Sequence, residues 1–423
     1  MADLIFVGWT STLNVRGTAD IIYSCAAVII TAIWAVLHLN IPAATDGTIR
    51  VLVRRVRWGI TSILAPDLLT LVAASQWVSA RRSVEQMKSP GNIGSWTIVH
   101  AFYADSGGFL FQAPGELAFP INAQCVHFLV SRGYIDMPAI TRDEIWDKSK
   151  ADVFAKAFAI LQTSWIVIQS IARTATGLSI SPLEIFTLAF VVSTAMSYYF
   201  WWNKPQHVAT PTTIQCKFPI SQILAGSGIP LDTPYVNTPL DFVDDSSRVY
   251  ERRDLFRNFG LKGKAGTNTD IRTPLHRMPD DAILPAGIPL YVYAMLAIPS
   301  LIHSSIHLLA WNHAFPTTIE QTLWRISAIS LASVSVVNFS IVRVLTLCGF
   351  QGKFNLTWVW VNMHRQESSN RRWFNFWDVL LGSFTLILII ARHYIIVEAI
   401  ISLRKSPVDA YTAVNWTGFL PHI

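Results

Sequence analysis

The chain has 423 residues, of which 52% are hydrophobic and only 14% are charged, and its mean hydropathy is +0.38. Because a soluble protein carries about 25% charged residues, this composition argues against an ordinary water-soluble protein and indicates a membrane protein. The net charge of +6 is modest and the basic residues stand beside apolar segments, which fits anionic lipid headgroups better than DNA or RNA.

Several apolar segments have about the 20 residues that an α-helix needs to cross a bilayer. The two in the centre of the chain form a predicted transmembrane hairpin, since a short stretch with Arg173 and Pro182 separates them. Trp201 and Trp202 at its end mark a membrane interface. In chain order, the predicted spans are residues 21–39, 58–78, 153–171, 183–202, 288–311, 324–347 and 374–401.

Pro66-Asp67 interrupts the predicted span 58–78 near its midpoint. A proline is tolerated in a transmembrane helix, but an aspartate there is unfavourable unless it faces a polar interior. Two interpretations stay open: a kink with a hydrogen-bonded Asp67 near a membrane rim, and a polar pocket inside the bundle.

Residues 95–111 are ambiguous, because the segment is short for a span and contains His100, Asp105 and Gly107-Gly108. It fits a span that faces a cavity, a re-entrant element or an interfacial helix. The positive-inside rule favours a crossing, and therefore about eight spans with both termini lumenal or extracellular. With that crossing, one side holds the loops that carry most Lys and Arg, namely 40–57, 113–152, 203–285 and 348–373.

The predicted fold is therefore all-α, a polytopic transmembrane bundle of seven or eight helices. Residues 1–202 are expected to form an N-terminal bundle with an interfacial subdomain at 113–152. Residues 203–285 are expected to be a polar cytosolic connection, and residues 286–423 a C-terminal bundle with a short tail. The four cysteines are widely spaced without a Cys-x-x-Cys pair, so we expect no disulfide framework, no metal and no cofactor.

Ionisable side chains at membrane depth are the main catalytic candidates. Asp67, Asp105 and Glu184 are the predicted acids, since apolar surroundings raise the pKa of a carboxyl group and suit it to proton donation. His100 joins them, because His100 and Asp105 can both reach a common cavity beside Gly107-Gly108.

A polar cluster of Asp147, Lys148, Lys150 and Asp152 precedes the central hairpin. On a helix, Asp147 and Lys150 share a face and can pair, and acidic residues favour a helix start, which by itself accounts for the cluster. The functional alternative is a binding site for a headgroup or diphosphate, in which Lys148 and Lys150 contact the anion.

His303 and His307 lie four residues apart, so a helix places both imidazoles on one face. No neighbouring carboxylate completes a metal site. We therefore expect either two satisfied interhelical histidines or a substrate-binding pair. Arg392 in the last predicted span is expected to extend its guanidinium to the membrane interface.

Several short motifs along the chain resemble those of a known family. They are Arg16-Gly17-Thr18, His38-Leu39-Asn40, His100-Ala101-Phe102, residues 147–152, Ile171-Ala172-Arg173, residues 201–205, Ala310-Trp311, Leu323-Trp324-Arg325 and Val414-Asn415-Trp416. Through them, nearly the whole chain resembles a large fungal family of multi-pass membrane proteins that is largely uncharacterised. Asp105-Ser106 departs from this family, which usually has an apolar pair there. The resemblance implies a fungal protein of internal membranes such as the endoplasmic reticulum, linked to specialised metabolism, and it implies no established reaction.

Two classes of function fit the sequence. The first is an intramembrane enzyme of terpenoid or lipid metabolism, an acid-initiated cyclase or isomerase whose cationic intermediates aromatic side chains would stabilise. The second is a transporter, receptor or membrane scaffold. The sequence slightly favours the enzyme, because ionisable groups lie in several spans without repeat symmetry. The expected partners are the lipid bilayer and a lipophilic small molecule, with no nucleic acid, and Asn415 is a predicted glycosylation site if the tail is lumenal.

Overall fold

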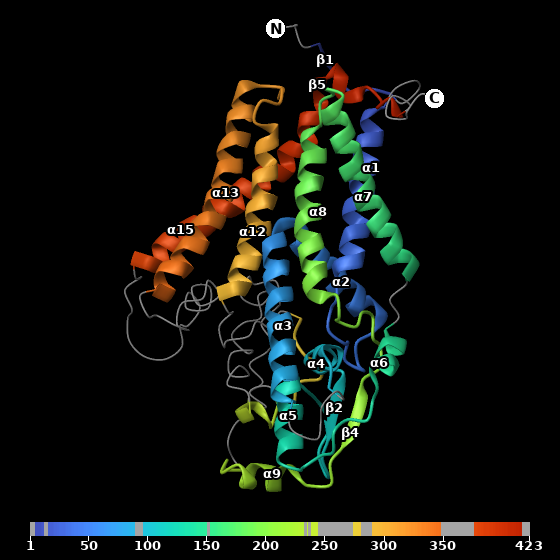
Figure 1. Cartoon of the computed structure of the whole chain (residues 1–423), viewed down its shortest axis with the longest axis vertical. Helices are drawn as coiled ribbons and strands as arrows, with labels where there is room; N and C mark the ends of the chain where they lie inside the picture. Colours follow the sequence, from blue (N-terminus) through green and yellow to red (C-terminus); the bar gives the residue numbers. More distant parts are fainter. Residues whose placement is uncertain are drawn as a thin grey trace.

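The computed structural model describes residues 5–11, 16–88, 96–149, 153–231, 235, 238–243, 274–280, 290–347 and 376–416. Within these ranges the chain is mostly helical and its strands are short, which confirms the predicted helical class. Long helices run side by side at one end of the molecule, and short helices and strands gather at the other end (Figure 1). We call these two parts the helical bundle and the lower unit.

The helices of the bundle lie close to predicted apolar segments. For example, α8 begins where the sequence indicates, because Ser181 accepts a hydrogen bond from the Glu184 backbone and Pro182 occupies the first turn. A tight turn with Gly177 at φ 73° connects it to the preceding helix. The bundle consists of α1 (Thr18–Val36), α7 (Val153–Ala175), α8 (Pro182–Trp201), α12 (Leu290–Ile306), α13 (Thr318–Leu347) and α15 (Phe376–Ile401).

Fewer helices qualify as membrane spans than the seven or eight predicted. Among the described residues, Thr18–Val36, Pro182–Trp201 and Leu386–Arg404 are each long and apolar enough to cross a membrane. A fourth candidate is a helix pair that is sharply bent at a break. The apolar stretch Ala294–Ala310 is shorter than these.

The predicted span at 58–78 is not one continuous helix, because two helices meet there. Helix α2 (Thr48–Leu64) ends at Ala65, and α3 (Pro66–Gln86) begins directly after it. Proline lacks an N–H group and disfavours a helical conformation in the residue before it, and Ala65 accordingly has φ −141° and ψ 66°. The chain turns by 113° at this break.

Within the segment 95–111, the described residues 96–111 do not form a span. Helix α4 (Ile98–Asp105) has only 8 residues, far fewer than a crossing needs, and strand β2 (Phe109–Gln112) follows it. Gly107 has φ 81°, a conformation that ends the helix and starts the turn into the strand. Because α4 and β2 belong to the lower unit, the argument for an eighth crossing at this place no longer holds.

The lower unit joins segments that the sequence assigned to separate regions. Strand β2 pairs antiparallel with β3 (Phe119–Ile121) and parallel with β4 (Thr212–Gln215), giving the order β3-β2-β4. The expected subdomain at 113–152 and the expected connection at 203–285 therefore share one sheet. Around it lie α5 (Ala123–Ser131), α6 (Arg142–Lys148), α9 (Ile220–Gly226) and the 3₁₀ turn η1 (Asp241–Val243).

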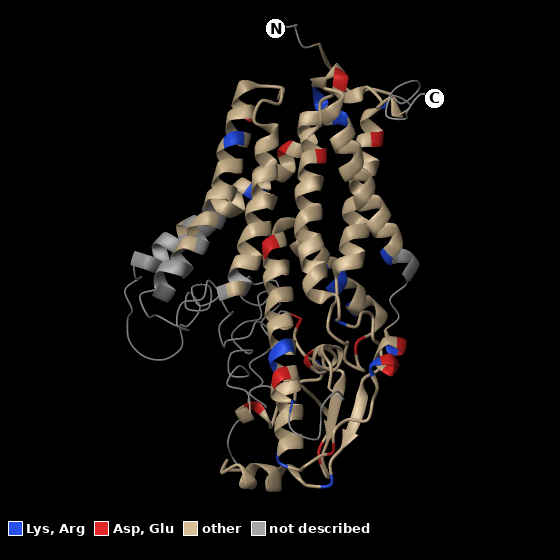
Figure 2. Ribbon diagram, in the orientation of Figure 1, with Lys and Arg blue, Asp and Glu red and all other residues tan. Residues whose placement is uncertain are grey.

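The two described ends of the chain meet at the far end of the bundle. Strand β1 (Phe6–Val7) pairs antiparallel with β5 (Ser406–Pro407), which lies between the 3₁₀ turns η3 (Ser402–Arg404) and η4 (Val408–Tyr411). Charged residues are sparse along the helices of the bundle and concentrate at this end and in the lower unit (Figure 2). This distribution is typical of a helical bundle whose middle lies in hydrocarbon.

Candidate functional site

A buried arginine contacts two histidines inside the helical bundle. Arg392 comes from α15, His303 from α12, and His307 from the turn η2 (His307–Ala310), and all three are buried. Arg392 Nη1 lies 2.8 Å from His303 Nε2 and 3.4 Å from His307 Nε2. Arg392 Nη2 donates to the Ile63 carbonyl oxygen at 3.3 Å. We call these residues the Arg392 centre.

The hydrogen bonds indicate that both histidines of the Arg392 centre are neutral. A guanidinium can only donate, so the Nε2 atoms of His303 and His307 must accept. His303 Nδ1 then carries the proton and donates to the Ala189 carbonyl oxygen of α8 at 2.7 Å. The centre therefore holds one positive charge and two neutral rings.

That positive charge has no ion-pair partner in the described part of the chain. Ion pairs within 4.0 Å are found elsewhere, and none of them includes Arg392. Asp67, an exposed residue in the first turn of α3, acts on Arg392 only from a longer distance. The Ile63 carbonyl belongs to the last turn of α2, where a helix dipole supplies a partial negative charge. A buried cation with so little compensation has an unfavourable free energy, which an incoming anion would relieve.

Aromatic side chains surround the Arg392 centre. The guanidinium carbon lies 5.4 Å from the centre of the Phe186 ring, and the His307 ring stacks on Phe186 at 6.3 Å. Trp324 of α13 donates from Nε1 to the His307 carbonyl oxygen at 2.9 Å. Two polar atoms of the centre, Arg392 Nε and His307 Nδ1, are buried without a hydrogen-bond partner among the described residues. These two atoms are available to donate hydrogen bonds to a ligand.

Comparison with known families places the chain in one of them. A family of unknown function, DUF8562, matches residues 2–225 and 291–423, and these ranges include every residue of the Arg392 centre. The chain belongs to this family. No curated protein and no solved structure matches it. Since the description of DUF8562 assigns no activity, the geometry of the site must carry the functional argument.

The structure of this DUF8562 protein changes the interpretation of His303, His307 and Arg392. The predicted pairing of the two imidazoles on one side of the chain is present, with ring centres 5.5 Å apart. The prediction that Arg392 reaches the interface is wrong, because its side chain turns inward to the histidines. Among the described residues, no group of three or more His, Cys, Asp or Glu side chains is placed to hold a metal ion.

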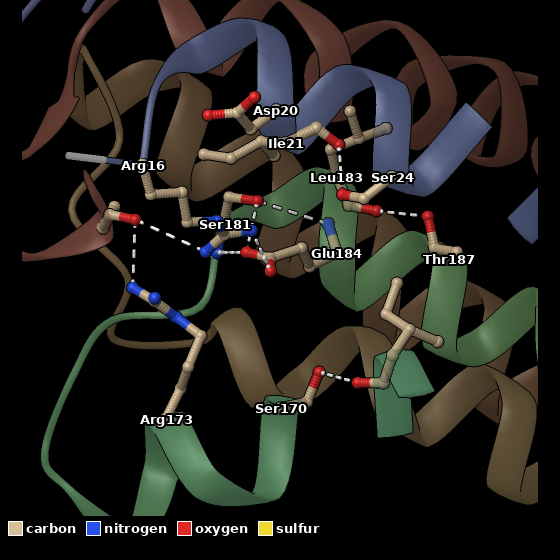
Figure 3. Close-up of polar contacts among 12 residues, drawn as sticks. Arg16, Asp20, Ile21, Ser24, Ser170, Arg173, Ser181, Leu183, Glu184 and Thr187 are labelled. Atoms are coloured by element: carbon tan, nitrogen blue, oxygen red, sulfur yellow. Dashed lines mark hydrogen bonds and ion pairs between the residues drawn. The ribbon is translucent and has the colours of Figure 1, made fainter. Parts of the chain in front are cut away.

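Glu184, a predicted catalytic acid, belongs to a network that holds the chain ends together (Figure 3). Its carboxylate pairs with Arg16 and accepts hydrogen bonds from the backbone N–H and hydroxyl of Ser181, at 3.0 and 2.9 Å. Beside it, Arg173 donates to carbonyl oxygens of the turn η4 and of Thr412. These bonds give Glu184 a structural role.

His100 and Asp105, the other predicted acid–base pair, lie in the lower unit. Burial lowers the pKa of His100, whose Nδ1 is 2.8 Å from the Thr97 hydroxyl and whose Nε2 is 2.9 Å from the Ile140 carbonyl oxygen. Asp105 Oδ1 accepts from the Ala123 backbone N–H at 3.0 Å, across the turn into α5. Both residues thus fix the backbone of the lower unit, and the structure does not bring them together with Glu184.

The predicted headgroup cluster is described only in part. Asp147 is exposed near the end of α6, and Lys148 Nζ donates to the Thr210 carbonyl oxygen at 3.5 Å. Lys150 and Asp152 lie outside the described residues. The headgroup interpretation stays a prediction.

A buried lysine, which the sequence indicated only as part of a motif, joins the end of α8 to α3 and to the loop after α1. Lys204 Nζ donates to Asn40 Oδ1 at 2.9 Å and to Gln76 Oε1 at 2.8 Å. Trp201 Nε1 donates to the same Gln76 oxygen at 3.0 Å. Burial lowers the pKa of Lys204 to about 7, although Asp280 and Asp105 oppose this shift. Two motifs of the sequence, at 38–40 and 201–205, thus meet in one hydrogen-bond network.

Proposed function

We propose that this protein is a polytopic membrane protein that binds and carries an amphiphilic small molecule with an acidic headgroup. Helices that can span a membrane support insertion, and the apolar side chains exposed along the bundle are typical of lipid-facing surfaces. Further apolar side chains are exposed on α7 and α13, which supports more crossings than the three that qualify alone. The motif resemblance favours an internal membrane of a fungal cell.

The uncompensated charge of Arg392 is the observation that carries the proposal. A carboxylate or phosphate of an amphiphile would neutralise the guanidinium, and its apolar tail would lie among the aromatic side chains and helices around it. His307 Nδ1 and Arg392 Nε provide additional donors for such an anion. An acidic amphiphile therefore fits this site better than a neutral hydrocarbon.

Binding requires a rearrangement at the α2–α3 break. Arg392 is enclosed by Ile63, His303 and His307, so an anion must displace one of these partners. The Ile63 carbonyl, at 3.3 Å, is held less closely than His303 Nε2 at 2.8 Å, and it lies two residues before the non-helical Ala65. Discontinuous helices that end near a buried charge are typical of membrane transporters. We therefore favour a carrier.

The alternative of an acid-initiated cyclase or isomerase has less support. An acid catalyst needs a carboxyl group that is free to donate a proton near the substrate. Glu184 is paired with Arg16, Asp105 accepts from a backbone N–H of the lower unit, and Asp67 is exposed at a helix break. These three predicted acids therefore do not converge on one site, and the cyclase or isomerase stays a prediction.

The test compares an acidic probe with its neutral analogue. The full-length protein in detergent is titrated with cis-parinaric acid and with its methyl ester, which has the same tail but an uncharged headgroup. Since a hydrogen bond to a charged group contributes roughly 1.5–3 kcal/mol, we expect the acid to bind roughly ten- to hundredfold more tightly than the ester. Arg392→Gln should abolish this preference, whereas Arg392→Lys should keep part of it.

Arg325→Gln is the matched control. Arg325 lies on α13 in the same bundle, donates to the Trp311 carbonyl oxygen at 2.8 Å, and is outside the Arg392 centre. This variant should bind both probes like the wild type. Equal binding of acid and ester by the wild type, or an unchanged preference in a folded Arg392→Gln protein, would overturn the proposal.

A further inference from the structure

Helix α2 directs its apolar face away from the protein. Its large apolar side chains recur at intervals of three and four residues, so they form one stripe along the helix. They are exposed to extents between 37% at Leu64 and 79% at Ile49. The stripe consists of Ile49, Leu52, Val53, Val56, Ile60 and Leu64.

The opposite face of α2 packs firmly on the bundle. Trp58, Gly59 and Ser62 are buried, and a Cβ atom at Gly59 would lie 3.2 Å from Ile33 Cγ2 of α1. Arg54 also points inward, where it donates to the Asn40 carbonyl oxygen at 2.7 Å and pairs with Asp280 at 3.5 Å. The helix is therefore held in one rotation, and its apolar stripe cannot turn inward.

Arginines border the apolar stripe on both sides. At 100° per residue, Arg50 and Arg57 fall on one edge of the stripe and Arg55 on the other. Arg50 is exposed and pairs with Asp46 at 3.0 Å, and Arg55 lies over the Trp34 ring at 5.3 Å. The sequence of α2 contains no acidic residue. An apolar face flanked by arginines is typical of a helix that lies in the surface of an anionic membrane.

The orientation of α2 fits this location. Helix α3 runs along the long axis of the molecule beside α8, and α2 turns away from it by 113° (Figure 1). With 17 residues, α2 is also shorter than a standard crossing. Trp34, at the end of α1 next to Arg55, is half-exposed and suits the interface between headgroups and hydrocarbon.

We propose that α2 is an in-plane membrane helix that binds anionic phospholipids in the leaflet on the side of the lower unit. Its apolar stripe lies among the first acyl carbons, and Arg50, Arg55 and Arg57 contact the phosphate and carboxylate groups of the lipids. The charge of the arginines favours a lipid over a second copy of the chain, whose α2 carries the same charges. This inference rests on the membrane insertion proposed above and is independent of the ligand at Arg392.

Photoreactive lipids test this inference on the full-length protein. The protein is placed in nanodiscs of phosphatidylcholine and phosphatidylserine that contain a diazirine analogue of one lipid or the other, and the adducts are mapped by mass spectrometry. We expect adducts on the α2 stripe, several-fold more from phosphatidylserine than from phosphatidylcholine. The exposed face of α1 with Tyr23 and Ile30 should react with both lipids alike.

Two variants separate the role of the arginines from general effects of charge. Replacement of Arg50, Arg55 and Arg57 by Gln should abolish the preference for phosphatidylserine on α2. Replacement of three basic residues of the lower unit (Arg132, Arg142 and Lys217) by Gln should leave it unchanged.

Two results would overturn the inference. Lipid adducts on α1 but none on α2 would indicate a second protein copy over the stripe, and equal reaction of α2 with both lipids would exclude anionic selectivity. If neither α1 nor α2 forms lipid adducts, membrane insertion itself is contradicted. Loss of adducts from α2 alone contradicts only the inference about α2.

Discussion

At the residue scale, Lys204 makes the stability of the protein depend on pH. Burial lowers the pKa of Lys204 from 10.5 to about 7. Between these pH values, Lys204 is therefore protonated in the unfolded chain and deprotonated in the folded chain. The free energy of unfolding therefore rises with pH from about 7 to 10.5, and the full penalty of burying the charged lysine applies below about 7.

Thermal unfolding in detergent across this pH range checks the prediction. Lys204→Met should flatten the rise of the unfolding temperature with pH, whereas Lys217→Met, at an exposed position, should leave the slope unchanged. A Lys204→Met protein with the slope of the wild type would show that this lysine does not titrate in the window.

The ion pair between Arg16 and Glu184 is a second feature at this scale. Glu184 is buried and the Arg16 side chain is only 9% exposed, so removal of one partner leaves the other charged and uncompensated. We expect Glu184→Gln to destabilise the protein by roughly 3 kcal/mol, and the double variant with Arg16→Gln to lose less than the sum of the two single changes.

Unfolding by sodium dodecyl sulfate measures these differences, and Glu144→Gln is the control. Glu144 closes the same kind of capping box on α6 but is exposed, so its loss should have a smaller effect. Strict additivity of the Arg16 and Glu184 changes would contradict the structural role of the pair.

The sequence could not predict that the Arg392 side chain points into the bundle, and the reason is physical. A lone arginine in an apolar segment can extend to the interface or turn inward, and the choice depends on what lies beside it. Its partners His303 and His307 are 89 and 85 residues away along the chain. The spacing of the histidines predicted their common side, but only tertiary packing brings the arginine to them.

At the element scale, the turn between α4 and β2 depends on Gly108. A Cβ atom there would lie 2.5 Å from ring carbons of Tyr103, which is fully buried and bonds the Thr212 hydroxyl at 3.0 Å. Gly108→Ala should therefore displace this ring and destabilise the lower unit by roughly 1–3 kcal/mol.

Limited proteolysis of the lower unit, together with thermal unfolding, measures this effect. Gly47→Ala is the comparison, because a Cβ atom at Gly47 meets nothing within 4 Å. Equal protease sensitivity of the two variants would contradict the close packing at Gly108.

Local signals explain which elements were predictable. The start of α8 follows from Ser181, Pro182 and Glu184, which act within one helical turn. Pro66 likewise indicated an interruption between α2 and α3. The size of the turn was not predictable, because it depends on distant packing such as the 2.8 Å bond between Thr70 and Ser197 hydroxyls. The lower unit was missed because β2 and β4 are far apart in sequence and only 4 residues long.

At the scale of the whole molecule, the two described ends of the chain lie together, and the lower unit lies at the opposite end (Figure 1). If the lower unit is cytosolic, the C-terminal tail is lumenal and Asn415, which is exposed, can be glycosylated. We expect a shift in apparent mass that endoglycosidase treatment and Asn415→Gln both remove. The reverse orientation would be indicated if the tail is not glycosylated and the lower unit resists protease in sealed microsomes.

A direct image of the site best tests the proposal that an acidic amphiphile neutralises Arg392. The measurement is cryo-electron microscopy of the full-length protein in nanodiscs with oleic acid, and separately with oleyl alcohol. We predict density for a headgroup against Arg392 and His307 with the acid only, accompanied by a shift of Ile63. A map in which Asp67 or another carboxylate of the chain pairs with Arg392, or in which acid and alcohol occupy the site alike, would contradict the account.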